Sequence, residues 1–222
     1  MPLCILHSLQ ALPADLLRSQ AELPQRRAAA LAQCACACLL PLLPLLPLAA
    51  SAAAAHGELP ALPPAHGRCD KDECLDDPIV KRVYNRVANV TRVPADNFEY
   101  MQMLRYLPCE YAGHPDCQFY KRHHDTIPEL TTMQPGPRVY TFFLYLSDVE
   151  EGGGTKFDGG FTVQPGKGKA VFWPATLEET PFVSDDRTHH EALPVLKGIK
   201  YAANFWLHQH DYVTPHKKGC TT

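Results

Sequence analysis

The 222-residue sequence has no excess of positive charge, since 21 lysine and arginine residues stand against 24 aspartate and glutamate residues. No basic run marks a surface that follows phosphates, so nucleic acid is not expected as a partner. The glycines at 152–154 are not followed by the Lys-Ser/Thr of a P-loop, and we interpret them as a turn. Cys69 and Cys74 lack the second Cys/His pair of a zinc finger, so a local disulfide in an oxidising compartment is favoured instead.

Charge is also missing from Ala28 to Ala55, an apolar segment that directly follows Arg26 and Arg27. A basic flank, an apolar stretch and a small-residue exit are the parts of a secretory signal, and the length also permits a membrane anchor. We therefore expect residues 1–55 to be a leader that directs the chain to the endoplasmic reticulum or secretory pathway, with or without membrane attachment. The alternatives are a low-complexity leader, an organelle transit peptide or a mis-set start codon.

Composition divides the remaining chain into three parts. We expect residues 56–75, which begin rich in proline, alanine and histidine, to be a linker, residues 76–214 to be one domain and residues 215–222 to be a tail. At the start of the domain, an Asp cap followed by Pro78 predicts a helix, whose apolar residues recur at helical spacing and which ends before Pro94.

Short apolar runs separated by glycine and proline dominate the rest of the domain. The expected strands are Phe98–Tyr106, Val139–Leu146, Ala170–Trp173 and Tyr201–Leu207. Runs of this length and spacing are typical of an all-β sandwich or barrel. We therefore expect a mainly β fold with flanking helices, of the double-stranded β-helix (cupin-like jelly-roll) type.

Two clusters that combine histidine with acidic residues indicate a metal site. In an extended segment residues two apart point to the same side, so His123 and Asp125 can bind one ion while His124 points away. A distant histidine from the second cluster, Arg187–Val195, would complete a site of two imidazoles and one carboxylate. This ligand set suits non-haem Fe(II) and leaves three coordination positions open.

The surrounding motifs carry a resemblance to a known family. In order along the chain they are NFEYMQMLRY, QFYKRHHD, RVYTFFLYLSDVEEGGGTKF, VQPGKGKAVFW and HHEALPVLKGIKYAANFWLH. From about Asp76 to His210 the sequence resembles the catalytic domain of the prolyl 4-hydroxylases, within the Fe(II)/2-oxoglutarate dioxygenases. The resemblance implies that Fe(2+), 2-oxoglutarate, O2 and L-ascorbate serve the hydroxylation of peptidyl proline to 4-hydroxyproline, with release of succinate and CO2. A proline-rich peptide or protein would be the substrate.

The same resemblance implies roles for individual residues. The implied metal ligands are His123, Asp125 and His190, which leaves His189 out. The implied contacts of 2-oxoglutarate are Lys200, Tyr106 and Thr141. Lys200 would pair with the far carboxylate of the cosubstrate, because a buried charge needs a partner. The implied substrate contacts, near the mouth of the site, are Tyr120, Arg138 and Trp206.

Two other functions remain as alternatives. One is a dioxygenase that acts on lysine or a small metabolite, because the metal ligands do not specify a peptide. The other is a catalytically dead jelly-roll module that binds proline-rich chains, since the leader and linker stand where the family has early strands. The loop between Cys109 and Cys117 is also longer than the family's turn at this place, and a disulfide between them would clip it closed.

Overall fold

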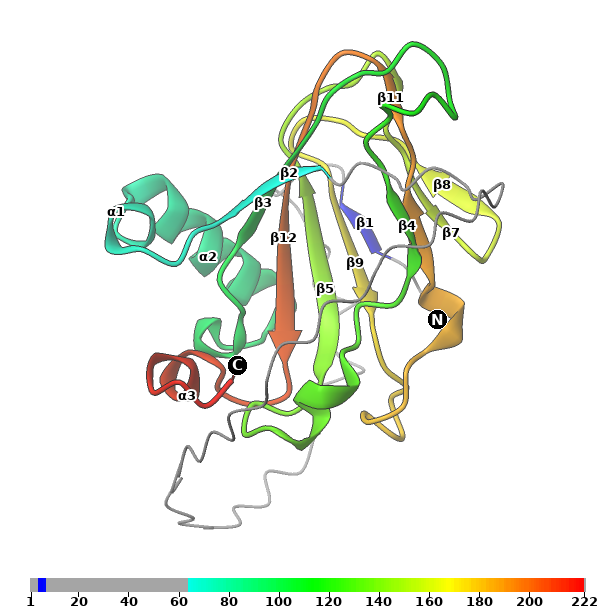
Figure 1. Cartoon of the computed structure of the whole chain (residues 1–222). Helices are drawn as coiled ribbons and strands as arrows, with labels where there is room; N and C mark the ends of the chain where they lie inside the picture. Colours follow the sequence, from blue (N-terminus) through cyan, green and yellow to red (C-terminus); the bar gives the residue numbers. More distant parts are fainter. Residues whose placement is uncertain (1–3, 7–63, 222) are drawn as a thin grey trace, which may run out of the picture. The chain divides into compact units, whose positions relative to one another are not determined.

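The structure is a computed structural model that describes residues 4–6 and 64–221 (Figure 1). The apolar segment Ala28–Ala55 lies outside the described residues, so the secretory leader stays a prediction. Among the residues that the structure describes, no helix is both long and apolar enough to span a bilayer.

Two antiparallel sheets form most of the domain. The larger has the order β1-β9-β5-β12-β3-β2, and the smaller β4-β10-β7-β8. The strands of the larger sheet are β1 (Cys4–Leu6), β2 (Ala65–Arg68), β3 (Gln102–Tyr106), β5 (Arg138–Tyr145), β9 (Ala170–Pro174) and β12 (Lys200–His208). Those of the smaller sheet are β4 (Tyr120–His123), β7 (Thr155–Phe157), β8 (Phe161–Val163) and β10 (His190–Ala192). A separate pair joins β6 (Glu151–Gly152) to β11 (Val195–Lys197).

The helices are short apart from one. They are α1 (Asp72–Leu75), α2 (Pro78–Thr91) and α3 (Val213–Lys217), with 3-10 turns at Ala95–Asn97, Pro128–Thr132 and Asp186–Thr188. In Figure 1 the helices lie at the left of the view and the smaller sheet at the right. The predicted mainly β jelly roll with flanking helices is confirmed.

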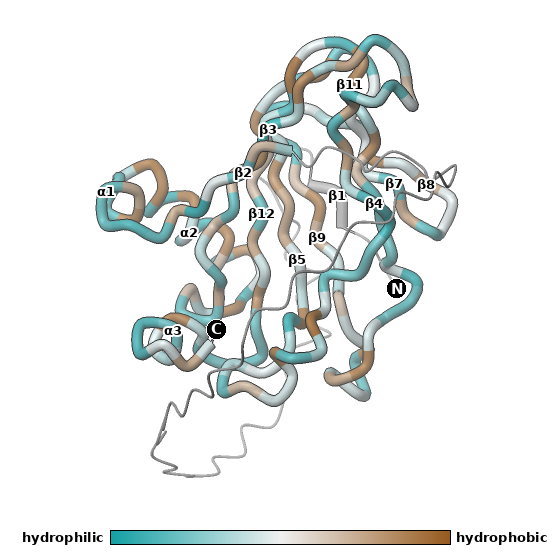
Figure 2. The backbone as a smooth tube through the Cα atoms, viewed as in Figure 1, coloured by the Kyte–Doolittle hydropathy of each residue, from teal (hydrophilic) through white to brown (hydrophobic). Residues whose placement is uncertain are grey.

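The central strands β5 and β12 are covered on both faces. Phe142 and Phe205 belong to a core with α2, whereas Phe143 and Tyr145 belong to a second core with the smaller sheet, where they meet Phe157. Because neither face is solvated, these strands are continuous apolar runs rather than alternating ones. Figure 2 shows this as white to brown colouring along much of β5, β9 and β12. The polar side chains that interrupt the second core are those of the candidate site.

Helix α2 begins and ends where the sequence predicts. The Asp77 carboxylate accepts hydrogen bonds from the backbone N–H groups of Ile79 (2.7 Å) and Val80 (3.2 Å), with Pro78 at the first helical position. At the other end Arg92 takes a left-handed conformation with φ of 60°, and the helix stops there. Its apolar side then packs on the larger sheet, which explains the 3.6-residue period of this segment.

The predicted boundaries of the domain are wrong at three places. Ala65–Arg68, expected in the linker, forms β2 and pairs with β3, and α1 follows it. Helix α3 reaches into the expected tail as far as Lys217, and Thr221 is buried. Cys4–Leu6, expected in the leader, pairs with β9. Without β1 and β2, the outer strands β9 and β3 would have unpaired backbone donors and acceptors. These groups pair with the two short strands from distant parts of the chain.

Two local disulfides confirm the cysteine pairings favoured from the sequence. Cys69 bonds to Cys74, with Cα atoms 5.4 Å apart, and ties the end of β2 to α1. Cys109 bonds to Cys117, with Cα atoms 5.0 Å apart, and closes the loop between β3 and β4. The backbone N–H of Cys109 donates to Val195 of β11, so this closed loop is anchored at its start.

A buried network of charged side chains joins β5, β12 and the segment just before β3. The Arg138 guanidinium donates twice to the Glu99 carboxylate, once at 2.9 Å, and His208 lies 2.9 Å from the same carboxylate. All three side chains are buried. Burial alone would raise the pKa of Glu99, but hydrogen bonds from His208 and Arg138 outweigh it and lower this pKa to about 2. Glu99 therefore stays ionised inside the domain.

Replacing Glu99 by glutamine is expected to destabilise the domain in a pH-dependent way. The stabilisation from the ionised carboxylate is complete above its ordinary pKa of 4.5 and is lost as the pH falls through about 2. We expect Glu99→Gln to lower the free energy of unfolding by about 3 kcal/mol at pH 7 and by less at pH 3, as measured by urea unfolding. Glu150→Gln, at an exposed pair with Lys197, should change stability little at either pH. Equal losses at both pH values would contradict the assignment.

Candidate metal centre

Three side chains converge on one point between the two sheets. His123 of β4 lies opposite His190 of β10 in the antiparallel register, with ring centroids 4.3 Å apart. Asp125 follows just beyond β4, and its carboxylate oxygens lie 3.7 Å from Nε2 of His123 and 3.6 Å from Nε2 of His190. Ligand atoms of the three residues lie within 4.8 Å of one another. The structure thus brings together the three ligands predicted from the sequence.

Hydrogen bonds orient each of the three ligands. Nδ1 of His123 is 2.7 Å from the carbonyl oxygen of Lys121, and Nδ1 of His190 is 3.0 Å from that of Thr188. A carbonyl can only accept, so Nδ1 carries the proton in both rings and Nε2 keeps its lone pair for a cation. Such partners fix the tautomer and orientation of histidine ligands.

The Asp125 carboxylate is held from the larger sheet. Thr141 of β5 donates its hydroxyl to one carboxylate oxygen at 2.7 Å, and the Trp206 indole of β12 donates to the other at 3.0 Å. Burial alone would raise the pKa of Asp125, but His190, His123 and these hydrogen bonds lower it overall. The carboxylate is therefore ionised without any contact with solvent.

The electrostatic state of the cluster matches what Fe(II) accepts from protein ligands. Burial, followed by the neighbouring His190, lowers the pKa of His123, so this imidazole is neutral at physiological pH. One ionised carboxylate and neutral imidazoles form a donor set of the two-histidine, one-carboxylate type. The residues present fit an Fe(II) ion, and no soft thiolate is required.

Lys200 is a buried cation without a carboxylate partner in the described part of the chain. It is fully buried, and its Nζ donates to the carbonyl oxygen of Gly153 at 2.8 Å. The ammonium lies 4.8 Å from the centroid of the Tyr106 ring, with Phe143 and Tyr145 slightly farther away. Burial lowers the pKa of Lys200 to about 7. A buried ammonium with one carbonyl contact has further N–H groups that can pair with an anionic group.

A cavity of about 380 Å³ contains the metal cluster. Its lining includes Tyr106, His123, Asp125, Phe143, His190 and Asn204. The volume lies in the range of small-molecule sites, and the walls combine apolar and aromatic surface with a few polar groups. Tyr106 lies opposite Lys200 in the β3–β12 register, so the buried ammonium and the cavity share one part of the sheet.

Three of the predicted contact residues make hydrogen bonds to Asp125 in this structure, and their roles on 2-oxoglutarate or substrate stay predictions; Arg138 and Trp206 also line the cavity. Thr141, expected on 2-oxoglutarate, donates to Asp125. Trp206, expected on substrate, donates to Asp125 as well. Arg138, also expected on substrate, uses its donors for Glu99 and for the Asp125 carbonyl (3.1 Å), and stacks 3.8 Å from the Trp206 ring centroid. All three side chains donate to Asp125, because a buried carboxylate and its carbonyl need hydrogen-bond donors.

The other predicted residues lie where a role in binding is feasible. Tyr120 is half exposed, lines the cavity, and places its ring centroid 4.4 Å from that of His123. Tyr106 is buried and lines the same cavity. Burial raises the pKa of the Tyr106 phenol, which therefore stays protonated and can donate a hydrogen bond.

Sequence reasoning missed Asn204 of β12. Its side chain lines the cavity, and its Oδ1 is buried without a hydrogen-bond partner among the described residues. A signal was present, because Lys200, Asn204 and Trp206 differ by even numbers of residues and so share one face of a strand. Glu99 and His208 were missed as well, and only their pairing across the fold reveals them.

Comparison with known proteins agrees with this geometry. The model of the 2OG-Fe(II) oxygenase superfamily matches residues 101–208, a range that contains the three ligands and Lys200. Over this range, which is just under half of the chain, the described domain is similar to the superfamily.

Two similar relatives are named prolyl 4-hydroxylases. Prolyl 4-hydroxylase subunit alpha-2 of Gallus gallus is 38% identical over 136 residues, covering 60% of this chain and 24% of the relative. Prolyl 4-hydroxylase 1 of Arabidopsis thaliana is 38% identical over 148 residues, covering 60% of this chain and 48% of the relative. The chain thus spans half or less of the length of these two relatives. A solved viral collagen prolyl hydroxylase from Paramecium Bursaria Chlorella virus-1, in complex with 2OG, is 26% identical with a TM-score of 0.49, covering 65% of this chain and 77% of that chain.

Removing the Thr141 hydroxyl is expected to weaken metal binding. Thr141→Val keeps the side-chain shape but leaves one oxygen of Asp125 without its donor. We expect the affinity for Fe(II), or for Co(II) as a stable substitute, to fall by about 10- to 100-fold in a metal titration under anaerobic conditions.

Thr155→Val is the matched control for this prediction. Thr155 is also a buried threonine that lines the cavity, but its hydroxyl pairs with Tyr145 rather than with a ligand. The control should bind metal as the unmodified chain does. Equal losses in both variants would show that the effect comes from general loosening of the domain.

Proposed function

We propose that this chain is a prolyl 4-hydroxylase that uses Fe(II) and 2-oxoglutarate to hydroxylate peptidyl proline, with release of succinate and CO2. The observation that carries this proposal is Lys200. Its buried ammonium, without a carboxylate partner among the described residues, lies on the same sheet as the residues that hold the metal ligands. A metal site alone needs no such cation, whereas a dicarboxylate that chelates the metal does.

Each group in the site has a task in this scheme. His123, Asp125 and His190 would hold the iron, and Lys200 with the Tyr106 hydroxyl would bind the far carboxylate of 2-oxoglutarate. When bound, the iron and 2-oxoglutarate would supply the activation of O2, from which the oxygen atom transferred to carbon comes. The protein itself orients the cosubstrate, and the apolar walls at Phe143 and Trp173 restrict water in the cavity. L-ascorbate would keep the iron reduced.

A proline-rich segment is the substrate that the mouth of the cavity favours. Tyr120 is half exposed there, beside the ligand His123. Proline-rich peptides are already extended in polyproline II conformation, and aromatic side chains bind them at low entropic cost. The names of the matching relatives support a peptidyl proline as the target.

We also propose that the chain works in the endoplasmic reticulum or secretory pathway, with or without membrane attachment. Two disulfides support an oxidising compartment, since such bonds are rare where thiols are kept reduced. The apolar segment at residues 28–55 supports entry into that compartment.

The first test is succinate release by the full chain with Fe(II), 2-oxoglutarate, ascorbate and a proline-rich peptide. We expect turnover that depends on the peptide, with one oxygen atom gained on proline by mass spectrometry. His190→Ala should abolish turnover, because it removes a ligand, whereas His210→Ala, at an exposed histidine, should retain it. Turnover with lysine peptides or a metabolite, but not with the proline-rich peptide, would contradict the proposed substrate. A folded, iron-loaded chain without any turnover would contradict the proposed enzymatic function.

The pH dependence of 2-oxoglutarate binding tests the role of Lys200. Above its pKa of about 7 in the free protein, Lys200 is neutral and must take up a proton to pair with the carboxylate. We therefore expect the affinity to fall by up to roughly tenfold per pH unit above pH 7. Calorimetry at pH 8.5 in two buffers of different ionisation enthalpy should show proton uptake on binding.

Two lysine variants make this test specific. Lys200→Met should lose the proton uptake and most of the affinity, since the carboxylate would be buried without a partner. Lys197→Met, three residues earlier and exposed, should behave as the unmodified chain does. If proton uptake on 2-oxoglutarate binding persists in Lys200→Met, a group other than Lys200 takes up the proton.

A further inference from the structure

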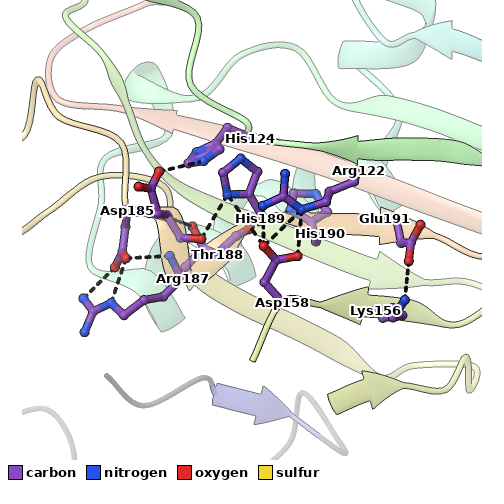
Figure 3. A network of polar contacts seen from close by, with 11 residues as sticks. Arg122, His124, Lys156, Asp158, Asp185, Arg187, Thr188, His189, His190 and Glu191 are labelled. Carbon is purple, nitrogen blue, oxygen red and sulfur yellow. Dashed lines mark hydrogen bonds and ion pairs between the residues drawn. The ribbon is translucent and has the colours of Figure 1, made fainter. Parts of the chain in front are cut away.

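A second cluster of metal-binding side chains lies next to the first and is not used by the proposed reaction. It consists of His124, Asp186 and His189, and ligand atoms of these three residues also lie within 4.8 Å of one another. Figure 3 shows the His124 and His189 rings side by side in a polar network. We name this group the outer cluster, and the group of His123, Asp125 and His190 the inner cluster.

Strand geometry explains why two such clusters exist. His123 pairs with His190 across β4 and β10, so their chain neighbours His124 and His189 come together next along the same two segments. Successive side chains point to opposite sides of an extended chain, so His124 and His189 meet on the other side from the ligands His123 and His190, although His124 still borders the cavity. The 3-10 turn that precedes β10 adds Asp186.

The distances suit shared coordination of one ion. Nε2 of His124 lies 3.3 Å from Oδ1 of Asp186. Two donors bound tetrahedrally to zinc at about 2.0–2.1 Å are themselves separated by roughly 3.3–3.4 Å. The third donor, His189, places its ring centroid 3.4 Å from that of His124. Two imidazoles on one tetrahedral ion keep their ring centroids farther apart than this, so the His189 ring must turn away from His124 to bind the same cation.

The ring nitrogens of His189 and His124 differ in their hydrogen-bond partners. Nδ1 of His189 lies 3.0 Å from the Asp186 carbonyl and so carries the proton, which leaves Nε2 as the nitrogen with a free lone pair. Nδ1 of His124 is buried without a hydrogen-bond partner among the described residues. Nε2 of His124 faces the Asp186 carboxylate at 3.3 Å, and a bound cation would replace the proton between these two atoms.

The surrounding charges favour a cation over a simple ion pair. His124 and His189 each lie near a carboxylate, Asp186 at 3.3 Å and Asp158 at 4.0 Å, but two imidazolium rings this close would repel each other. Three carboxylates, Asp158, Asp185 and Asp186, stand against the guanidinium groups of Arg122 and Arg187. Asp186 itself is 90% exposed, so an ion can enter directly from solution.

We propose that the outer cluster is a second transition-metal site, which takes a late divalent ion of the Zn2+ class. Two imidazoles and one carboxylate are donors that Zn2+ binds, with a fourth position left for water. The ion would tie β4 to the segment before β10. It would thereby brace the two segments that carry the inner ligands, without taking part in the reaction.

Zinc stoichiometry of the full chain tests this proposal. The chain and its variants are dialysed against buffered micromolar Zn2+, and bound metal is counted by elemental mass spectrometry. Relative to the unmodified chain, we expect one zinc ion fewer for Asp186→Asn, one fewer for His190→Ala, and two fewer for the combined variant. Asp186→Asn changes an exposed side chain, so the fold should survive. Asp116→Asn is the matched control, because Asp116 is 80% exposed and lies 3.8 Å from His114, but belongs to neither cluster.

Two further readouts separate this site from the inner one and from hydroxylation. In His190→Ala, Zn2+ should raise the melting temperature and Co2+ should give the visible absorption of a tetrahedral site, and both effects should vanish in the combined variant. None of these measurements requires turnover, so failure of the proposed hydroxylase would leave them unaffected. If Asp186→Asn binds as much zinc as Asp116→Asn, or if the tetrahedral Co2+ signal survives in the combined variant, the outer site is overturned.

Discussion

The buried, ionised carboxylate of Asp125 is the group around which the interior is arranged. An unpaired carboxylate away from water would be very costly, so each of its oxygens requires donors. Thr141 of β5 and Trp206 of β12 supply them, and Arg138 binds the carbonyl of the same residue. Arg138 is in turn neutralised by Glu99, to which His208 also bonds. The hydrogen bonds that position a metal ligand therefore also join the strands of the larger sheet.

Alternation along β12 separates the site from the scaffold. Ala203, Phe205 and Leu207 face α2 and form the first core. Lys200, Asn204 and Trp206 occupy the alternate positions, where Asn204 and Trp206 line the cavity and Lys200 lies opposite Tyr106, which also lines it. Because one strand serves both purposes, a shift of its pairing by one residue would place aromatic rings in the site and the lysine in the apolar core. Packing against the helix thus helps to define the geometry of the site.

Much of the fold and the inner cluster could be predicted because their signals are local. The Asp77 cap, the apolar runs of β5, β9 and β12, and the spacing of His123 and Asp125 are each contained in a short window of sequence. Choosing His190 over His189 required the family resemblance. The pairing of Arg138 with Glu99 was not predicted because Glu99 lies 39 residues away, and His208 lies 109 residues from Glu99. Pairings at such separations leave no periodic trace, and neither does the edge pairing of β2.

The adjacent histidines also bear on how the register of β4 and β10 is specified. A slip by one residue would bring His124 and His189 to the inside, so two imidazoles would still face the cavity. Asp125 would then turn outward, and the donors of Thr141 and Trp206 would be buried without acceptors, which costs about 1–3 kcal/mol for each group. The carboxylate rather than the histidines therefore distinguishes the two registers. Once it fixes the inner cluster, the remaining two histidines are forced together outside, where Asp186 makes the pair able to bind a metal.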